Sequence, residues 1–229
     1  MVRDAAKRDA AREDFNRMRE RLRDPLLTVL TIVLAFWMFV LAPLHHSAAR
    51  DTNIVGFLLA LTVAGALLVL SGRAIPALLM LFGLSLSAAA AWFRLHEPSS
   101  FDILLNASAW IIMGLVLIWV VGRAVFAPGR ITFHRIMGAI LLYLAIGLTF
   151  AALYAFVGVL STDASPTLSS TMIYFSFGTL TTAGSGDIVP LNAFARSLSN
   201  VEAMIGQLYP ATLLARLVTL EIEGETKRG

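Results

Sequence analysis

Residues 179–190, TLTTAGSGDIVP, form the stretch whose residue types and spacing are best suited to chemistry. Its centre, TAGSG, carries no bulky side chain, so its backbone carbonyl oxygens can face a narrow axis, and Thr182 adds a hydroxyl oxygen. Gly184 and Gly186 permit backbone angles that aim successive carbonyls in one direction. Oxygen atoms arranged in this way can replace the water around a dehydrated cation. The stretch therefore predicts a cation site built from the main chain.

The elements around this stretch are apolar segments of unequal length. Segments 134–160 and 192–220 are long enough to cross a bilayer, whereas 167–180 is too short. We therefore expect residues 134–220 to form a helix, a short re-entrant helix, the glycine-rich loop and a second helix. Non-helical backbone at membrane depth is tolerated only where protein buries it or where it lines water. The carboxyl end of the short helix would stabilise a cation near the membrane centre through its negative dipole end.

The composition is that of a membrane protein. Of the 229 residues, 58% are hydrophobic and 14% are charged, whereas soluble domains are nearer half apolar and a quarter charged. The chain has no cysteine, so disulfides and thiol chemistry are excluded. It contains no HExxH motif and no nucleophile–base pair, so we expect no enzyme and no cofactor. Membrane topology explains the net charge of +3 better than nucleic-acid binding does.

The topology follows from the apolar segments and the arginines. Six segments are near or above the roughly 20 residues that span the hydrocarbon core: 26–42, 54–71, 74–93, 102–121, 134–160 and 192–220. If the amino terminus is inside, four arginines fall in inside loops, as the positive-inside rule requires: Arg73, Arg123, Arg130 and Arg135. We therefore expect a multi-pass protein of the cell (inner or plasma) membrane, in contact with lipids and with both termini cytoplasmic.

One segment resembles a known family. YFSFGTLTTAGSGDIVP resembles the pore signature of tetrameric potassium channels, whose filter usually reads T-V-G-Y-G-D after T-x-T. Residues 130–220 are also similar to the outer and inner pore helices of small bacterial members, whereas the first four helices match only in number and length. The resemblance implies an all-α membrane protein with a pore helix and a selectivity filter. One loop cannot surround an ion, so it also implies a homotetramer with four-fold symmetry.

The resemblance implies roles for individual positions. Monovalent cations, potassium in the family, would be bound by filter carbonyls and by the Thr182 hydroxyl; the filter positions are Thr182, Ala183, Gly184, Ser185 and Gly186. Asp187 would lie at the outer mouth, where it would support the filter or attract cations. Three residues of the pore helix would also support the filter, namely Tyr174, Thr179 and Thr181. Gly206 would be a gating hinge, and Pro210 would bend the inner helix because it removes a hydrogen bond.

The filter departs from the family pattern at two positions, where Ala183 replaces valine and Ser185 replaces tyrosine. In the family that tyrosine packs and hydrogen-bonds against pore-helix aromatic residues, which are Tyr174 and Phe175 here. Serine cannot span the distance, and Gly178 in the pore helix is small as well. We therefore expect looser support behind the filter and weakened or altered selectivity for potassium over sodium.

Charge and hydropathy along the chain predict a domain division, and after the last apolar segment we expect no cytosolic ligand-binding domain. The segments are a charged amphipathic cytoplasmic helix (1–24), a four-helix voltage-sensor-like domain (25–122), a linker (123–133), the pore domain (134–220) and a cytoplasmic tail (221–229). The fourth helix has no arginine at three-residue spacing, although voltage sensing needs several charges in the field. We therefore expect no steep voltage dependence.

Glu202 is an acid within the last apolar segment, and two readings of it stay open. It could support the filter from behind, near Ser185 or Asp187, or face the hydroxyls of the pore helix. Alternatively, it is a partly hydrated acid stabilised by the amino-terminal dipole of its own helix.

The function that follows is passive cation conduction through a tetrameric pore, with potassium as the expected ion and no voltage gating. A sodium-permeable, non-selective channel is one alternative. A non-conducting membrane protein that keeps the channel fold is the other.

Overall fold

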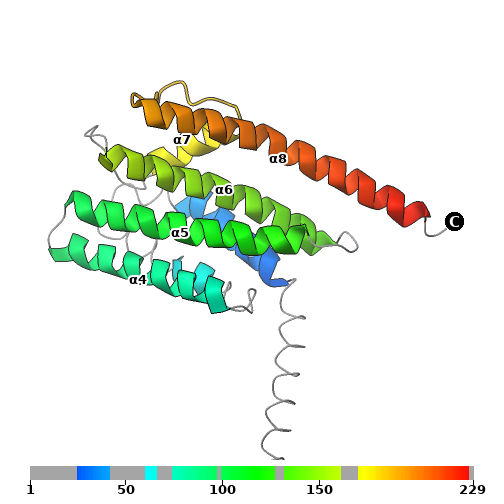
Figure 1. The fold of residues 1–229 in the computed structure, drawn as a ribbon, viewed down its shortest axis with the longest axis horizontal. Coiled ribbons are helices and arrows are strands. Elements are labelled where there is room, and N and C mark those ends of the chain that lie inside the picture. Colours follow the sequence, from blue (N-terminus) through cyan, green and yellow to red (C-terminus); the bar gives the residue numbers. More distant parts are fainter. Residues whose placement is uncertain are drawn as a thin grey trace, which may run out of the picture.

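The computed structural model describes residues 25–41, 60–65, 74–96, 99–126, 132–160 and 170–226. All regular structure within these residues is helical (Figure 1). The elements are a first helix Pro25–Leu41, whose last turn is the π-helical η1 (Trp37–Leu41), a short helix at 60–65, α4 (Ala74–His96), α5 (Ser100–Val125), α6 (Phe133–Leu160), α7 (Ser170–Leu180) and α8 (Ala193–Thr226). The predicted amino-terminal helix 1–24 and most of the predicted segment 54–71 lie outside the described residues.

Three helices are long and apolar enough to cross a membrane, namely Ala74–His96, Ser100–Val125 and Phe133–Gly158. They agree with three of the predicted segments and make this a multi-pass membrane protein. The first helix, Pro25–Leu41, is apolar but shorter. The six crossings therefore stay a prediction.

The short helix α7 packs between two long helices, α6 and α8. In Figure 1, α4, α5 and α6 lie side by side in chain order, and α8 runs along the other side of α6. The short α7 packs against both α6 and α8. It ends at Leu180 without crossing the layer, as expected for the re-entrant helix. α8 continues to Thr226, so it includes most of the segment predicted as a tail.

An apolar core joins the first helix to the others. Its most buried large side chains come from the first helix and from α4, α5 and α6: Leu30, Leu34, Met38, Met80, Met113, Val121 and Leu141. A smaller cluster of Phe150, Tyr154 and Phe175 joins α6 to α7. The outer face of α4 exposes large apolar side chains, which lipid would cover.

Polar contacts join the middle and the carboxyl-terminal part of α8 to its neighbours. The Tyr209 hydroxyl donates a hydrogen bond of 2.7 Å to the carbonyl of Ala139 on α6. The Arg216 guanidinium donates to the carbonyl of Phe126, just past the end of α5, and lies 5.1 Å from the centre of that ring. Phe126 and Arg216 are 90 residues apart in the chain, so this contact links the end of α5 to the last helix.

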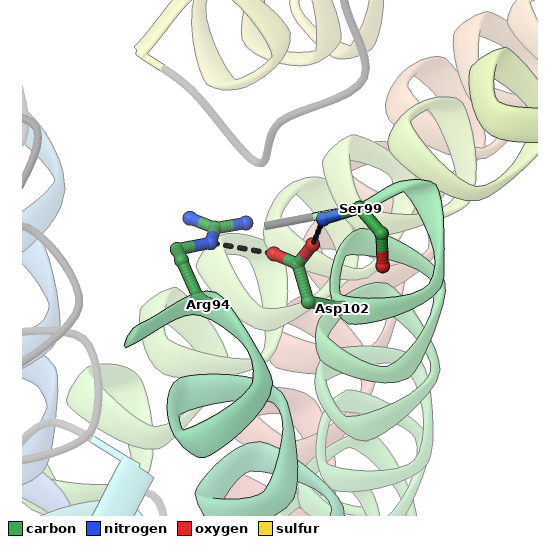
Figure 2. A network of polar contacts seen from close by, with 3 residues as sticks. All are labelled: Arg94, Ser99 and Asp102. Atoms are coloured by element: carbon green, nitrogen blue, oxygen red, sulfur yellow. Dashed lines mark hydrogen bonds and ion pairs between the residues drawn. The ribbon is translucent and has the colours of Figure 1, made fainter. Parts of the chain in front are cut away.

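A buried acid closes the turn between α4 and α5 (Figure 2). Asp102, only 2% exposed, accepts hydrogen bonds from Arg94 Nε at 2.6 Å and from the Ser99 backbone N–H at 2.8 Å. A carboxylate in the first helical turn that binds the N-cap N–H is a capping contact. It explains why α5 begins at Ser100, before the expected residue 102: the Asp102 charge is compensated within the turn.

Removing the arginine of this turn should destabilise the helix pair. Arg94→Ala leaves the buried Asp102 carboxylate without its charged donor, which we expect to cost about 2 kcal/mol. Thermal unfolding of the purified protein in detergent would measure the loss as a lowered midpoint. Asp102→Asn keeps an acceptor for the Ser99 N–H and should lose less. Equal midpoints for Arg94→Ala and the unaltered protein would contradict a stabilising role for this pair.

Candidate cation site and its support

The loop after α7 has an alternating backbone. Every second residue has a positive φ: 57° at Thr182, 75° at Gly184 and 61° at Gly186. Glycine adopts this left-handed region at little cost, as predicted at both glycines. The angle at Thr182 was not predicted, and it is a conformational outlier because a β-branched residue rarely adopts it.

The alternating loop is open to its surroundings in the single chain. Thr182, Ala183, Gly184 and Gly186 are exposed, and Ser185 is half-buried. These are the positions predicted to bind a monovalent cation, and the structure brings them together in one continuous loop.

The loop is anchored to α7 through the backbone. The Thr182 N–H donates to the carbonyl of Thr179 at 2.9 Å, and the Gly184 N–H donates to the carbonyl of Gly178 at 3.0 Å. A Cβ on Gly178 would lie 3.5 Å from the backbone nitrogen of Ser185, which is an ordinary contact distance. The loop therefore folds back against the last turn of α7.

The carbonyl of Ser185 has partners within its own chain. It accepts hydrogen bonds from the Asp187 N–H at 2.5 Å and from the Tyr174 hydroxyl at 3.3 Å. The Ser185 hydroxyl donates in turn to the carbonyl of Ile188 at 3.3 Å. A carbonyl oxygen has two lone pairs, so an ion at this position would have to displace these contacts. Tyr174 of α7 thus reaches the loop, whereas the Ser185 hydroxyl bonds to Ile188 and not to α7.

Charged residues follow the carboxyl end of the loop. Asp187 is exposed, and its carboxylate raises the pKa of the neighbouring Tyr174 phenol because a negative charge disfavours the phenolate. Beyond it, Arg196 Nε donates to the carbonyl of Pro190 at 2.9 Å. The Asn192 side chain accepts the Phe194 N–H at 2.8 Å and caps the start of α8.

The hydroxyls of the two predicted support threonines bind their own helix. Thr179 donates to the carbonyl of Phe175 at 2.9 Å, and Thr181 donates to that of Phe177 at 2.6 Å. They therefore stabilise the end of α7, and their contribution to the loop passes through the backbone.

Glu202 lies behind α7, where it joins three helices. It is 0% exposed. Its Oε2 accepts a 2.6 Å hydrogen bond from the Tyr154 hydroxyl of α6, and its Oε1 lies 2.5 Å from the Ser176 hydroxyl of α7. Of the two open readings, the structure has Glu202 facing a hydroxyl of α7, with its side chain fully buried in the single chain.

The protonation of Glu202 is linked to the partners of the Ser176 hydroxyl. The Ser176 hydroxyl also lies 2.7 Å from the backbone carbonyl of Gly147. A serine hydroxyl has one proton and a carbonyl has none. A proton on the Glu202 carboxyl would let Glu202 donate to Ser176 and would free the Ser176 proton for the carbonyl of Gly147. A neutral acid also avoids the cost of a buried charge.

Gly206 lies where α8 passes closest to α7. A Cβ at this position would overlap the carbonyl oxygen of Leu180 and lie 2.7 Å from its carbonyl carbon. Close packing therefore explains the glycine, and its predicted role as a hinge stays a prediction. Pro210 lies within α8 and has no N–H, so the carbonyl of Gly206, four residues earlier, loses its usual donor.

The sequence analysis did not identify the side chains from distant positions in the chain that contact the loop and α7. Gln207 Nε2 donates to Thr182 Oγ1 at 2.8 Å, and the Tyr143 hydroxyl donates to the carbonyl of Leu180 at 3.2 Å. Tyr154 and Ser176 were missed as partners of Glu202. The available signal was a set of polar side chains in otherwise apolar helices, because such groups need partners when buried.

Comparison with known families bears on this half of the chain. Residues 138–222 match a family model described as "Ion channel". The match supports an ion-channel family. It runs from α6 to α8 and includes the whole loop, and it points to ion conduction by an oligomeric membrane assembly and to a non-enzymatic role. No curated protein and no solved structure matches the chain.

Proposed function

We propose that this chain is the subunit of a homotetrameric cation channel of the cell membrane that passes potassium, with potassium ions bound in the loop 182–186 and both termini cytoplasmic. The observation that carries the proposal is the exposed loop with alternating φ at the end of the short α7. Four such loops around one axis would supply rings of main-chain oxygens, and an ion at the level of Ser185 would displace the contacts that its carbonyl makes with Asp187 and Tyr174. The family match over the same residues supports conduction.

The support behind the loop agrees with this role. α7 is held by the contacts of Glu202 with Ser176 and Tyr154 and by the close approach of Gly206 to Leu180, at the base of the loop. A rigid base is what a site needs when it must hold oxygens at fixed distances from an ion. The described part of the four-helix unit has Arg94 at the outer turn of α4 and Arg123 at the inner end of α5. We therefore propose a pore without voltage gating.

Flux through the purified protein tests conduction. Full-length protein, first shown to be tetrameric by mass, would be placed in liposomes loaded with potassium chloride, and uptake of radioactive rubidium would be followed. We expect uptake that barium blocks. Tetramers without blockable uptake would favour the non-conducting alternative.

The contacts of Ser185 favour altered selectivity over strict potassium selectivity. Its carbonyl binds Asp187 and Tyr174, and its hydroxyl binds the carbonyl of Ile188 instead of a group on α7. We expect the double variant Ala183→Val, Ser185→Tyr to raise the potassium-to-sodium permeability ratio several-fold, because the larger side chains would add contacts between the loop and its surroundings and hold its carbonyls more firmly. Reversal potentials in bilayers with the two ions on opposite sides would measure it. An unchanged ratio would show that these positions do not control selectivity.

A further inference from the structure

Gln207 contacts the inner end of the loop from another helix. Its Nε2 lies 2.8 Å from Thr182 Oγ1, and both side chains are exposed in the single chain. Gln207 follows Gly206, where α8 meets the last residue of α7. The close approach at Gly206 therefore holds the Gln207 side chain against the first residue of the loop.

Thr182 needs such a contact because its backbone is strained. A β-branched residue at φ 57° is stable only when its surroundings hold it. The Thr182 N–H is held by the carbonyl of Thr179, and its hydroxyl is held by Gln207. One contact fixes the main chain and the other fixes the side chain.

The geometry of the hydroxyl decides what it can offer an ion. A hydroxyl oxygen has two lone pairs and one proton. Gln207 donates to one lone pair, which leaves the second for a cation. The amide is neutral, so it orients the oxygen without adding charge to the site.

We propose that Gln207 is the positioning residue of the innermost cation site, where its amide holds the Thr182 hydroxyl in the orientation that ligates the ion. The inference deepens the proposed function and rests on it, because the site belongs to the proposed tetramer. It adds a residue outside the loop whose loss weakens potassium binding.

Equilibrium binding tests the inference separately from conduction. The full-length tetramer in detergent would be melted at increasing potassium chloride, with choline chloride keeping the ionic strength constant, because a bound ion stabilises the folded form. Gln207→Met has a similar length but no donor, and we expect it to weaken potassium binding about fivefold, the effect of one hydrogen bond. Asn200→Leu removes another exposed amide of the same helix and should bind potassium as the unaltered protein does.

A double-mutant cycle shows whether Gln207 acts through Thr182. Thr182→Val removes the hydroxyl and keeps the branched shape, so in that background Gln207→Met should change potassium binding no further. Thr182→Ser keeps the hydroxyl and should keep the effect of Gln207→Met. A general packing role for Gln207 would produce the same loss in all three backgrounds.

The outcomes separate the inference from the proposed function. Potassium binding that depends on Gln207 and Thr182, together with liposomes that take up no rubidium, would overturn the proposed conduction and uphold the inference. The inference is overturned if Gln207→Met binds potassium normally, if its effect persists with Thr182→Val, or if potassium does not stabilise the unaltered tetramer.

Discussion

Replacing Gly206 by alanine should abolish ion flux and lower the thermal stability of the assembly. The added methyl group would overlap the backbone carbonyl of Leu180, and no side-chain rotation relieves a clash with backbone. α8 would have to move away from α7, which separates Gln207 from Thr182 and loosens the base of the loop. Overpacking a well-packed site usually costs about 1–3 kcal/mol, and a backbone clash lies at the upper end. Thermal unfolding and rubidium uptake would measure the two effects.

Gly122→Ala is the matched control for this variant. A Cβ on Gly122, within α5, would meet only one Leu142 methyl at 3.9 Å, so this exchange should leave stability and flux unchanged or slightly improved. The two variants, Gly206→Ala and Gly122→Ala, also distinguish a packing role of Gly206 from a hinge role. If Gly206→Ala changed flux while the unfolding midpoint stayed constant, flexibility at Gly206 would be the better explanation, and the close-packing account would be wrong.

Exchanging Glu202 for alanine should destabilise the protein severely, whereas exchanging it for glutamine should be tolerated. Alanine leaves a cavity and two buried hydroxyls, those of Tyr154 and Ser176, without their partner. Cavity formation of this size costs about 2–5 kcal/mol, and each unsatisfied polar group adds about 1–3 kcal/mol. Glutamine has nearly the shape of a neutral carboxylic acid, accepts from Tyr154 through its carbonyl and donates to Ser176 through its amide.

The comparison of these two variants tests the proton count. Unfolding midpoints in detergent should rank the unaltered protein and Glu202→Gln close together and Glu202→Ala far below them. Ser176→Ala, which removes the acceptor of the carboxyl proton, should fall between. If Glu202→Gln were as unstable as Glu202→Ala, the carboxyl would have to be ionised, and the arrangement of protons proposed for Ser176 and Gly147 would be incorrect.

The long helices could be predicted because hydropathy is a local property. Segments 74–93, 102–121 and 134–160 correspond to α4, α5 and α6, and 167–180 corresponds to α7. The ends were less predictable. α5 starts two residues early because Asp102 binds Arg94 across the turn, and a charged residue that is paired does not end an apolar helix.

The loop could be placed from sequence, whereas its support could not. Glycine spacing predicted positive φ at Gly184 and Gly186, since only glycine adopts that region freely. The side chain of the left-handed Thr182 is contacted by Gln207, 25 residues further along the chain, and no local pattern predicts such a contact. The partners of Glu202 are likewise 26 and 48 residues away.

A glycine within a helix can be required for bending or for close packing, and Gly206 illustrates the difference. The family resemblance implies a hinge at Gly206, because a hinge residue is usual at this position of the inner helix. The structure gives a different reason, since the carbonyl of Leu180 occupies the space that any side chain would need. This distinction depends on the packing of α7 against α8 and could not be made from the sequence.

Anomalous X-ray diffraction from crystals of the full-length protein grown in rubidium chloride would test the central claim most directly. The account predicts a four-fold assembly with rubidium density on the axis, between main-chain oxygens of residues 182–186 contributed by four copies. A monomer, or an assembly whose loops point away from any common axis with no rubidium between them, would contradict it.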